Sequence, residues 1–110
     1  MDQQTVQEGK TTAVIAYIFF IGGIIAVFMN IDSKNKFAAF HIRQAVGIHL
    51  TYFLFIFIIS NLDSWLISTC FILIIMTSYL YGIVNAAQGK ANLLPVVGTY
   101  FQQWFKTFAP

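Results

Sequence analysis

The six basic and four acidic side chains of this 110-residue chain are gathered in short clusters, and the gaps between these clusters limit its fold most strongly. Residues 11–31, 44–62 and 64–89 carry no Asp, Glu, Lys or Arg. A helix that crosses the hydrocarbon core of a bilayer needs about 20 mostly apolar residues. Each of the three runs reaches that length, so the sequence predicts three transmembrane helices.

The composition of the chain supports the same fold class. Hydrophobic residues make up 58% of the sequence and charged residues only 9%, whereas soluble domains average about 25% charged residues. A soluble chain this short has too high a surface-to-volume ratio to hide so much apolar surface. We therefore expect an all-α membrane protein whose outward faces contact lipid.

The apolar runs and the polar segments between them divide the chain into one membrane domain, 1–110. We predict a polar N-terminal tail at 1–10, transmembrane helices at 11–29, 37–60 and 65–87, and a C-terminal interfacial amphipathic helix at 96–108. In that last helix Val97, Phe101 and Trp104 recur at helical spacing, opposite a polar face. A fourth span over residues 93–108 stays open as an alternative, although it would have to hide Gln102 and Lys106.

The basic side chains are distributed unevenly along this predicted topology. With three spans, one side of the membrane receives Lys34, Lys36, Arg43, Lys90 and Lys106, and the other side receives only Lys10. Cytoplasmic loops carry an excess of Lys and Arg. The predicted location is the cell inner (plasma) membrane, multi-pass, with the N-terminus outside and the C-terminus cytoplasmic. A net charge of +2 is too small to indicate a nucleic-acid partner.

The two histidines and the lone cysteine give little sign of catalysis. His41 and His49 are eight residues apart, hence about 12 Å along a helix axis, too far to ligate one ion. No carboxylate lies within the three runs, and no Ser-His-Asp or Cys-His grouping is visible. We predict no enzyme activity and no catalytic, metal or cofactor site. His49 is expected to form a neutral hydrogen bond with a hydroxyl group such as that of Thr77 or Tyr79.

Two motifs with unusual polar residues resemble a known family. Residues 37–45, FAAFHIRQA, resemble the F-x-x-F-H-A-R-Q-A opening of the second helix in the Tic-twenty-like family of small bacterial membrane proteins. Residues 81–90 with 94–98 resemble the end of its third helix, I-x-A-A-x-x-G-K-x-x-x-x-P-x-I-G. The resemblance covers roughly residues 12–105. The positions that match the family pattern are His41, Arg43, Gln44, Asn85, Gly89, Lys90 and Pro95.

The resemblance implies a role in membranes but little chemistry. The family is named for a chloroplast inner-envelope import subunit, and its plastid members are proposed to form part of a protein-conducting path with four spans. This chain departs from that pattern in its last segment. We expect a non-enzymatic component of a membrane assembly, a homo-oligomer or a larger complex, linked to protein translocation or transport. The alternative is an oligomeric pore or carrier for a small solute.

The motif residues define a candidate polar cluster of His41, Arg43, Gln44, Asn85, Gly89 and Lys90. Polar groups in hydrocarbon are costly, so their faces are expected to point toward other helices. Because both motifs lie at the cytoplasmic ends of their predicted helices, the side chains of His41, Gln44 and Asn85 are expected to meet near that interface.

Overall fold

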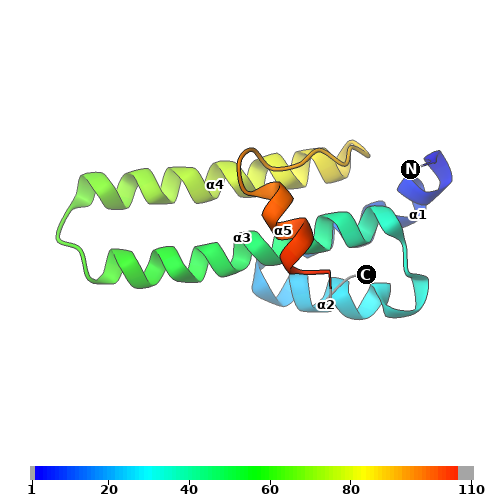
Figure 1. Cartoon of the computed structure of the whole chain (residues 1–110), viewed down its shortest axis with the longest axis horizontal. Helices are drawn as coiled ribbons and strands as arrows, with labels where there is room; N and C mark the ends of the chain where they lie inside the picture. The colour runs from blue at the N-terminus through cyan, green and yellow to red at the C-terminus, as the bar shows by residue number, and fades with distance from the viewer. Residues whose placement is uncertain (1, 107–110) are drawn as a thin grey trace.

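A computed structural model describes residues 2–106, which form helices and turns and contain no strand. The all-α class predicted from the sequence is therefore confirmed. The helices are α1 (Gln3–Ala16), α2 (Phe19–Ser33), α3 (Lys36–Ser60), α4 (Trp65–Ala87) and α5 (Gly98–Trp104). They pack into an elongated body of 48 × 22 × 21 Å (Figure 1).

The antiparallel pair α3 and α4 runs along most of the length of the molecule (Figure 1). At 25 and 23 residues, these helices are about 37 and 34 Å long. Both are long and apolar enough to cross a membrane. Each begins at a side-chain cap, because Asn35 accepts a hydrogen bond from Ala38 N–H and Ser64 accepts one from Ile67 N–H. Their bounds lie within one residue of the predicted ranges 37–60 and 65–87.

The N-terminal third of the chain differs from the prediction. The expected tail at 1–10 is largely helical, since Asp2 caps α1 by accepting a hydrogen bond from Thr5 N–H at 2.8 Å, which lowers the pKa of its carboxyl. The expected helix at 11–29 is broken near Tyr17, and Phe19 has a φ of 54°. Two helices rather than three are long enough to span, because α2 has only 15 residues.

Helices α1 and α2 fold back on each other as an N-terminal hairpin (residues 3–33). A Cβ atom at Gly22 would collide with the carbonyl oxygen of Ile15, so the glycine allows the two backbones to touch. Gly22 and Ala26 are both buried. At the open end of the hairpin, Asn35 Nδ2 donates to the carbonyl oxygen of Thr5 at 2.8 Å. The first apolar run therefore returns to the end from which it started.

This return places the start of α1 beside the end of α4, at one end of the molecule. A Cβ atom at Gly89, just past the end of α4, would lie 2.9 Å from Cγ1 of Val6 in α1. The sequence-based topology had put the N-terminus and the C-terminal region on opposite sides of a membrane. That topology requires residues 11–29 to run straight, whereas the helix is broken near Tyr17 in this fold, so a third span over these residues is not confirmed.

The chain after α4 also folds back, along the surface of α4 (Figure 1). Tyr81 donates to the carbonyl oxygen of Leu93 at 3.0 Å, and residues 94–97 share a hollow with Leu73 and Thr77. Helix α5 then crosses α3, where the Phe101 ring occupies space that a Cβ at Gly47 would need. The predicted interfacial helix at 96–108 is thus a seven-residue helix, and residues 107–108 lie outside the described chain.

The N-terminal hairpin predicts a short distance that a straight first span would not allow. We place spin labels at Gln7→Cys and Lys90→Cys in a Cys70→Ser background and measure the distance between them by pulsed electron–electron double resonance. This distance should be well below the roughly 30 Å thickness of a bilayer core. The control pair, Gln7→Cys with Asp63→Cys, should give a distance beyond about 30 Å. The reverse order would contradict the fold.

Candidate functional site

A buried hydrogen-bonded network joins the end of α1 to α3. The hydroxyl oxygen of Tyr17 lies 2.7 Å from Nδ1 of His41, and Nε2 of Gln44 donates to the same hydroxyl at 3.2 Å. The side chains of His41 and Gln44 are fully buried and that of Tyr17 is 2% exposed. This aromatic hydroxyl therefore connects two residues of the motif predicted on α3.

The same network continues into the loop that follows α4. Gln44 Oε1 accepts a hydrogen bond from Leu94 N–H at 2.8 Å, and His41 Nε2 lies 2.8 Å from the carbonyl oxygen of Lys90. A carbonyl oxygen only accepts, so Nε2 of His41 carries the hydrogen. A neutral imidazole with Nδ1 accepting from Tyr17 satisfies every partner. The network thus runs in one direction, from Leu94 N–H through three side chains to the Lys90 carbonyl.

Asn85 and Gly89 shape the loop rather than join the buried network directly. Gly89 has a φ of 75°, and Lys90 N–H donates to the carbonyl oxygen of Asn85 at 2.8 Å, which is the hydrogen bond of a Schellman motif. Asn85 Oδ1 accepts from Nδ2 of Asn92 at 2.8 Å. The helix end set by these residues presents the Lys90 carbonyl to His41.

Arg43 lies apart from this network and on another face of α3. It donates from Nη1 to Oε1 of Gln102 at 3.3 Å, while Nε2 of Gln102 donates to the carbonyl oxygen of Phe40 at 2.8 Å. Arg43 and Gln102 therefore attach α5 to α3. Of the predicted cluster, the structure links His41, Gln44 and Lys90 directly, whereas Arg43 belongs to a separate contact.

Tyr17 and Leu94 complete the network and were missed by sequence reasoning. Tyr17 lies in a run interpreted as one continuous helix, far from His41 in the chain. In the structure the Tyr17 ring lies against Gly82 of α4, where a Cβ atom would overlap it. This glycine was the one feature of the sequence that could have indicated the contact. Leu94 contributes through its backbone, for which the side-chain pattern holds no signal.

His49 forms the second buried polar contact, at the tip of the N-terminal hairpin. Its Nε2 lies 2.9 Å from the carbonyl oxygen of Ala16 and its Nδ1 lies 2.6 Å from the hydroxyl of Tyr79. The carbonyl requires the hydrogen on Nε2, so the Tyr79 hydroxyl donates to Nδ1. Ala16 is the last residue of α1, where carbonyl groups lose their helical partners. The predicted hydrogen bond to Tyr79 is present, and the ring also caps a helix end.

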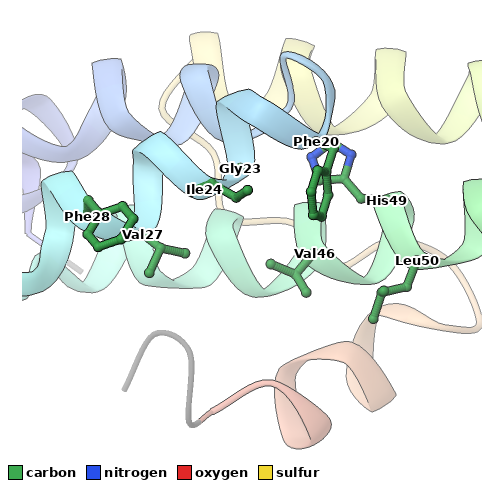
Figure 2. A pocket seen from close by; sticks show the side chains of 8 residues that line it. All are labelled: Phe20, Gly23, Ile24, Val27, Phe28, Val46, His49 and Leu50. Atoms are coloured by element: carbon green, nitrogen blue, oxygen red, sulfur yellow. The ribbon is translucent and has the colours of Figure 1, made fainter.

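An apolar groove runs between α2 and α3 beside His49 (Figure 2). Its volume is about 270 Å³, and eight residues line it: Phe20, Gly23, Ile24, Val27, Phe28, Val46, His49 and Leu50. Both ring nitrogens of His49 are engaged elsewhere. The groove therefore offers hydrocarbon contact and suits a flexible apolar chain.

The chemistry of these sites is dominated by satisfied hydrogen bonds. Within residues 2–106, no buried side-chain nitrogen or oxygen lacks a hydrogen-bond partner. In the same residues no group of three or more His, Cys, Asp or Glu side chains is arranged to hold a metal ion. What the buried polar side chains do is fix the hairpin and the loop after α4 against the α3–α4 pair.

Comparison of the chain with protein-family models, with curated proteins and with solved structures finds no match.

Removing the Tyr17 hydroxyl should destabilise the fold. Tyr17→Phe leaves His41 Nδ1 and Gln44 Nε2 buried without their shared partner, and each such group costs about 1–3 kcal/mol. We expect a lower free energy of unfolding in detergent, measured by denaturant titration. The matched change Tyr100→Phe, on an exposed ring, should have almost no effect. Equal effects of the two changes would show that the network does not hold the fold.

Because His49 caps the end of α1, two substitutions at the hairpin tip should lower the stability of the fold by different amounts. His49→Leu leaves the Ala16 carbonyl and the Tyr79 hydroxyl unpaired, whereas Tyr79→Phe removes one partner of an imidazole that keeps its bond to Ala16. The first change should therefore lower thermal stability more than the second, by about 1–3 kcal/mol. Stability measured by thermal unfolding in the same detergent tests this order, and a larger loss for Tyr79→Phe would contradict it.

Proposed function

We propose that this chain is a multi-pass membrane protein anchored by α3 and α4. The observation that carries this proposal is the exposure of α4. Only 11% of its most apolar stretch is buried, and only 33% of that of α3. The core helix of a soluble protein would be mostly buried, and a large exposed apolar surface indicates contact with lipid or a partner. Lipid supplies that contact where the two helices are not covered by the other segments.

The hydroxyl groups on these two helices fit a lipid environment. Ser60 donates to the carbonyl oxygen of Ile56 and Thr69 to that of Trp65, both at 2.7 Å, and Ser78 donates to that of Ile74 at 2.9 Å. Such bonds to the preceding turn satisfy a hydroxyl without water. Polar groups on a spanning helix need internal partners of this kind.

We propose a topology in which the start of α1 and the end of α4 face the cytoplasm. Lys10, Lys34, Lys36 and Lys90 lie in segments that meet at the end of the molecule that holds the α2–α3 turn and the end of α4. The turn between α3 and α4 carries only Asp63. This distribution favours a cytoplasmic basic end in the inner (plasma) membrane.

Within the membrane, we propose a non-enzymatic role as a small component of a larger assembly. The two buried networks use their polar groups to hold the fold, which leaves the outward surface of the helices for interaction. The motifs around His41 and Asn85 support a connection with the Tic-twenty-like family, and hence with protein translocation or transport. An oligomeric pore or carrier is the second candidate; in residues 2–106 every buried side-chain polar atom is paired, so a polar path would have to form between several copies.

Extraction and partner capture test this proposal. The protein should stay with membranes after washing at high pH and high salt, and should enter solution only with detergent.

Capture from mild detergent, followed by mass spectrometry, should recover membrane proteins of one assembly. A control capture with Tyr17→Phe, which weakens the fold, should recover fewer of them. Release by the alkaline wash alone would contradict membrane anchoring, and a strict monomer would contradict the assembly role.

A further inference from the structure

We propose that the chain is a membrane wedge, which favours bilayers bent so that the leaflet holding its basic end lies on the convex side. This proposal rests on the proposed membrane placement of α3 and α4. It follows from a difference in width between the two ends of the molecule, visible in Figure 1. The narrow end is defined here as residues 54–72, and the wide end as the rest of the described chain.

The difference in width comes from the lengths of the helices. Helices α1 and α2 have 14 and 15 residues, hence about 21–22 Å each, against about 37 Å for α3. Because both pack on α3 from its basic end, about 15 Å of α3 extends beyond them. The hydrocarbon of one leaflet is also about 15 Å thick. The N-terminal hairpin therefore occupies one leaflet and ends near the bilayer centre.

Side-chain contacts show how far the N-terminal hairpin and the loop after α4 extend from the basic end of the molecule. At the hairpin tip, the rings of Phe20 and Phe53 are 5.5 Å apart. The loop after α4 reaches its limit where residues 94–97 lie beside Leu73. Beyond this level α3 and α4 contact each other, as in the stacked pair Phe55 and Phe71 at 4.7 Å.

Exposed apolar side chains surround the narrow end. Phe57, Trp65 and Leu66 are 70%, 79% and 61% exposed. No charged side chain accompanies them on the helices there; Asp63 is in the turn. The chemistry of this surface matches acyl chains of the leaflet opposite the basic end, and we take lipid as its occupant.

The physical consequence is an unequal demand for area in the two leaflets. Each helix has a diameter of about 10–12 Å with its side chains. The leaflet around the wide end must accommodate α1, α2 and the C-terminal segment in addition to the two spans. Bending the bilayer so that this leaflet is stretched relieves the mismatch, whereas the opposite bend increases it. The protein should therefore accumulate in membrane regions whose curvature lowers the free energy of the protein and its surrounding lipid.

Sorting between a flat membrane and a narrow membrane tube tests the proposal. The protein is labelled with a small dye at Asp63→Cys in a Cys70→Ser background and reconstituted into giant vesicles, from which a tube is pulled outward. An impermeant quencher identifies the orientation of each population. Molecules with the basic end outward should be enriched in the tube by about twofold or more, and molecules with the opposite orientation should be depleted. The reversed population serves as the matched control.

Two results would overturn the wedge. One is equal density in tube and vesicle for both orientations, or sorting of the opposite sign. The other is a second copy covering the narrow end, since a pair joined there would remove the difference in width. The exposed Cys70 lies in that region, so efficient oxidative cross-linking of the unmodified protein between two copies would reveal such a pair. Failure to float with vesicles at all would instead contradict the proposed membrane placement.

Discussion

The hydrogen bond from His49 to the carbonyl oxygen of Ala16 is the contact on which the rest of the fold depends. A helix that ends inside an apolar environment exposes carbonyl groups, and each unpaired group costs several kcal/mol in hydrocarbon. The imidazole of α3 provides a partner for the last residue of α1. The chain can therefore reverse direction at Tyr17 and form a hairpin that does not cross the full length of α3.

Aromatic rings that pack against glycines connect the N-terminal hairpin and α5 to the α3–α4 pair. The rings of Tyr17 and Phe101 lie over Gly82 and Gly47, while Cδ2 of His49 would be 3.0 Å from a Cβ at Gly23. Glycine permits such close approach because it has no side chain. The ring contacts and the hydrogen bonds act on the same residues at Tyr17 and His49. Packing and polar satisfaction thus specify one arrangement together.

The long helices were predictable because their apolar runs, polar caps and lengths agree with one another. The break in the first run was not, because residues 17–19 contain neither proline nor glycine, and its cause is a tertiary contact with His49. One indication was present in the charges. Folding the first run back places Lys10 with Lys34 and Lys36, and leaves no basic side chain at the opposite end.

The candidate site was predictable only in part for the same reason. The motif on α3 indicated that His41 and Gln44 face the interior, and both are fully buried. Their shared partner, Tyr17, belongs to the segment whose course was mispredicted. The loop after α4 is held through backbone groups of Lys90 and Leu94, which no side-chain pattern reveals. His41 and Gln44 of the motif thus hold both the N-terminal hairpin and the loop after α4 against α3.

Side-specific labelling of cysteines tests the central claim, that the first apolar run enters the membrane and leaves it on the same side. Single cysteines replace Glu8, Ser33, Gln88 or Asp63 in a Cys70→Ser background, and an impermeant maleimide is applied to intact cells and to inverted membrane vesicles. We expect the first three positions to react only in inverted vesicles and position 63 to react only in intact cells. Reaction of positions 8 and 33 from opposite sides would contradict it.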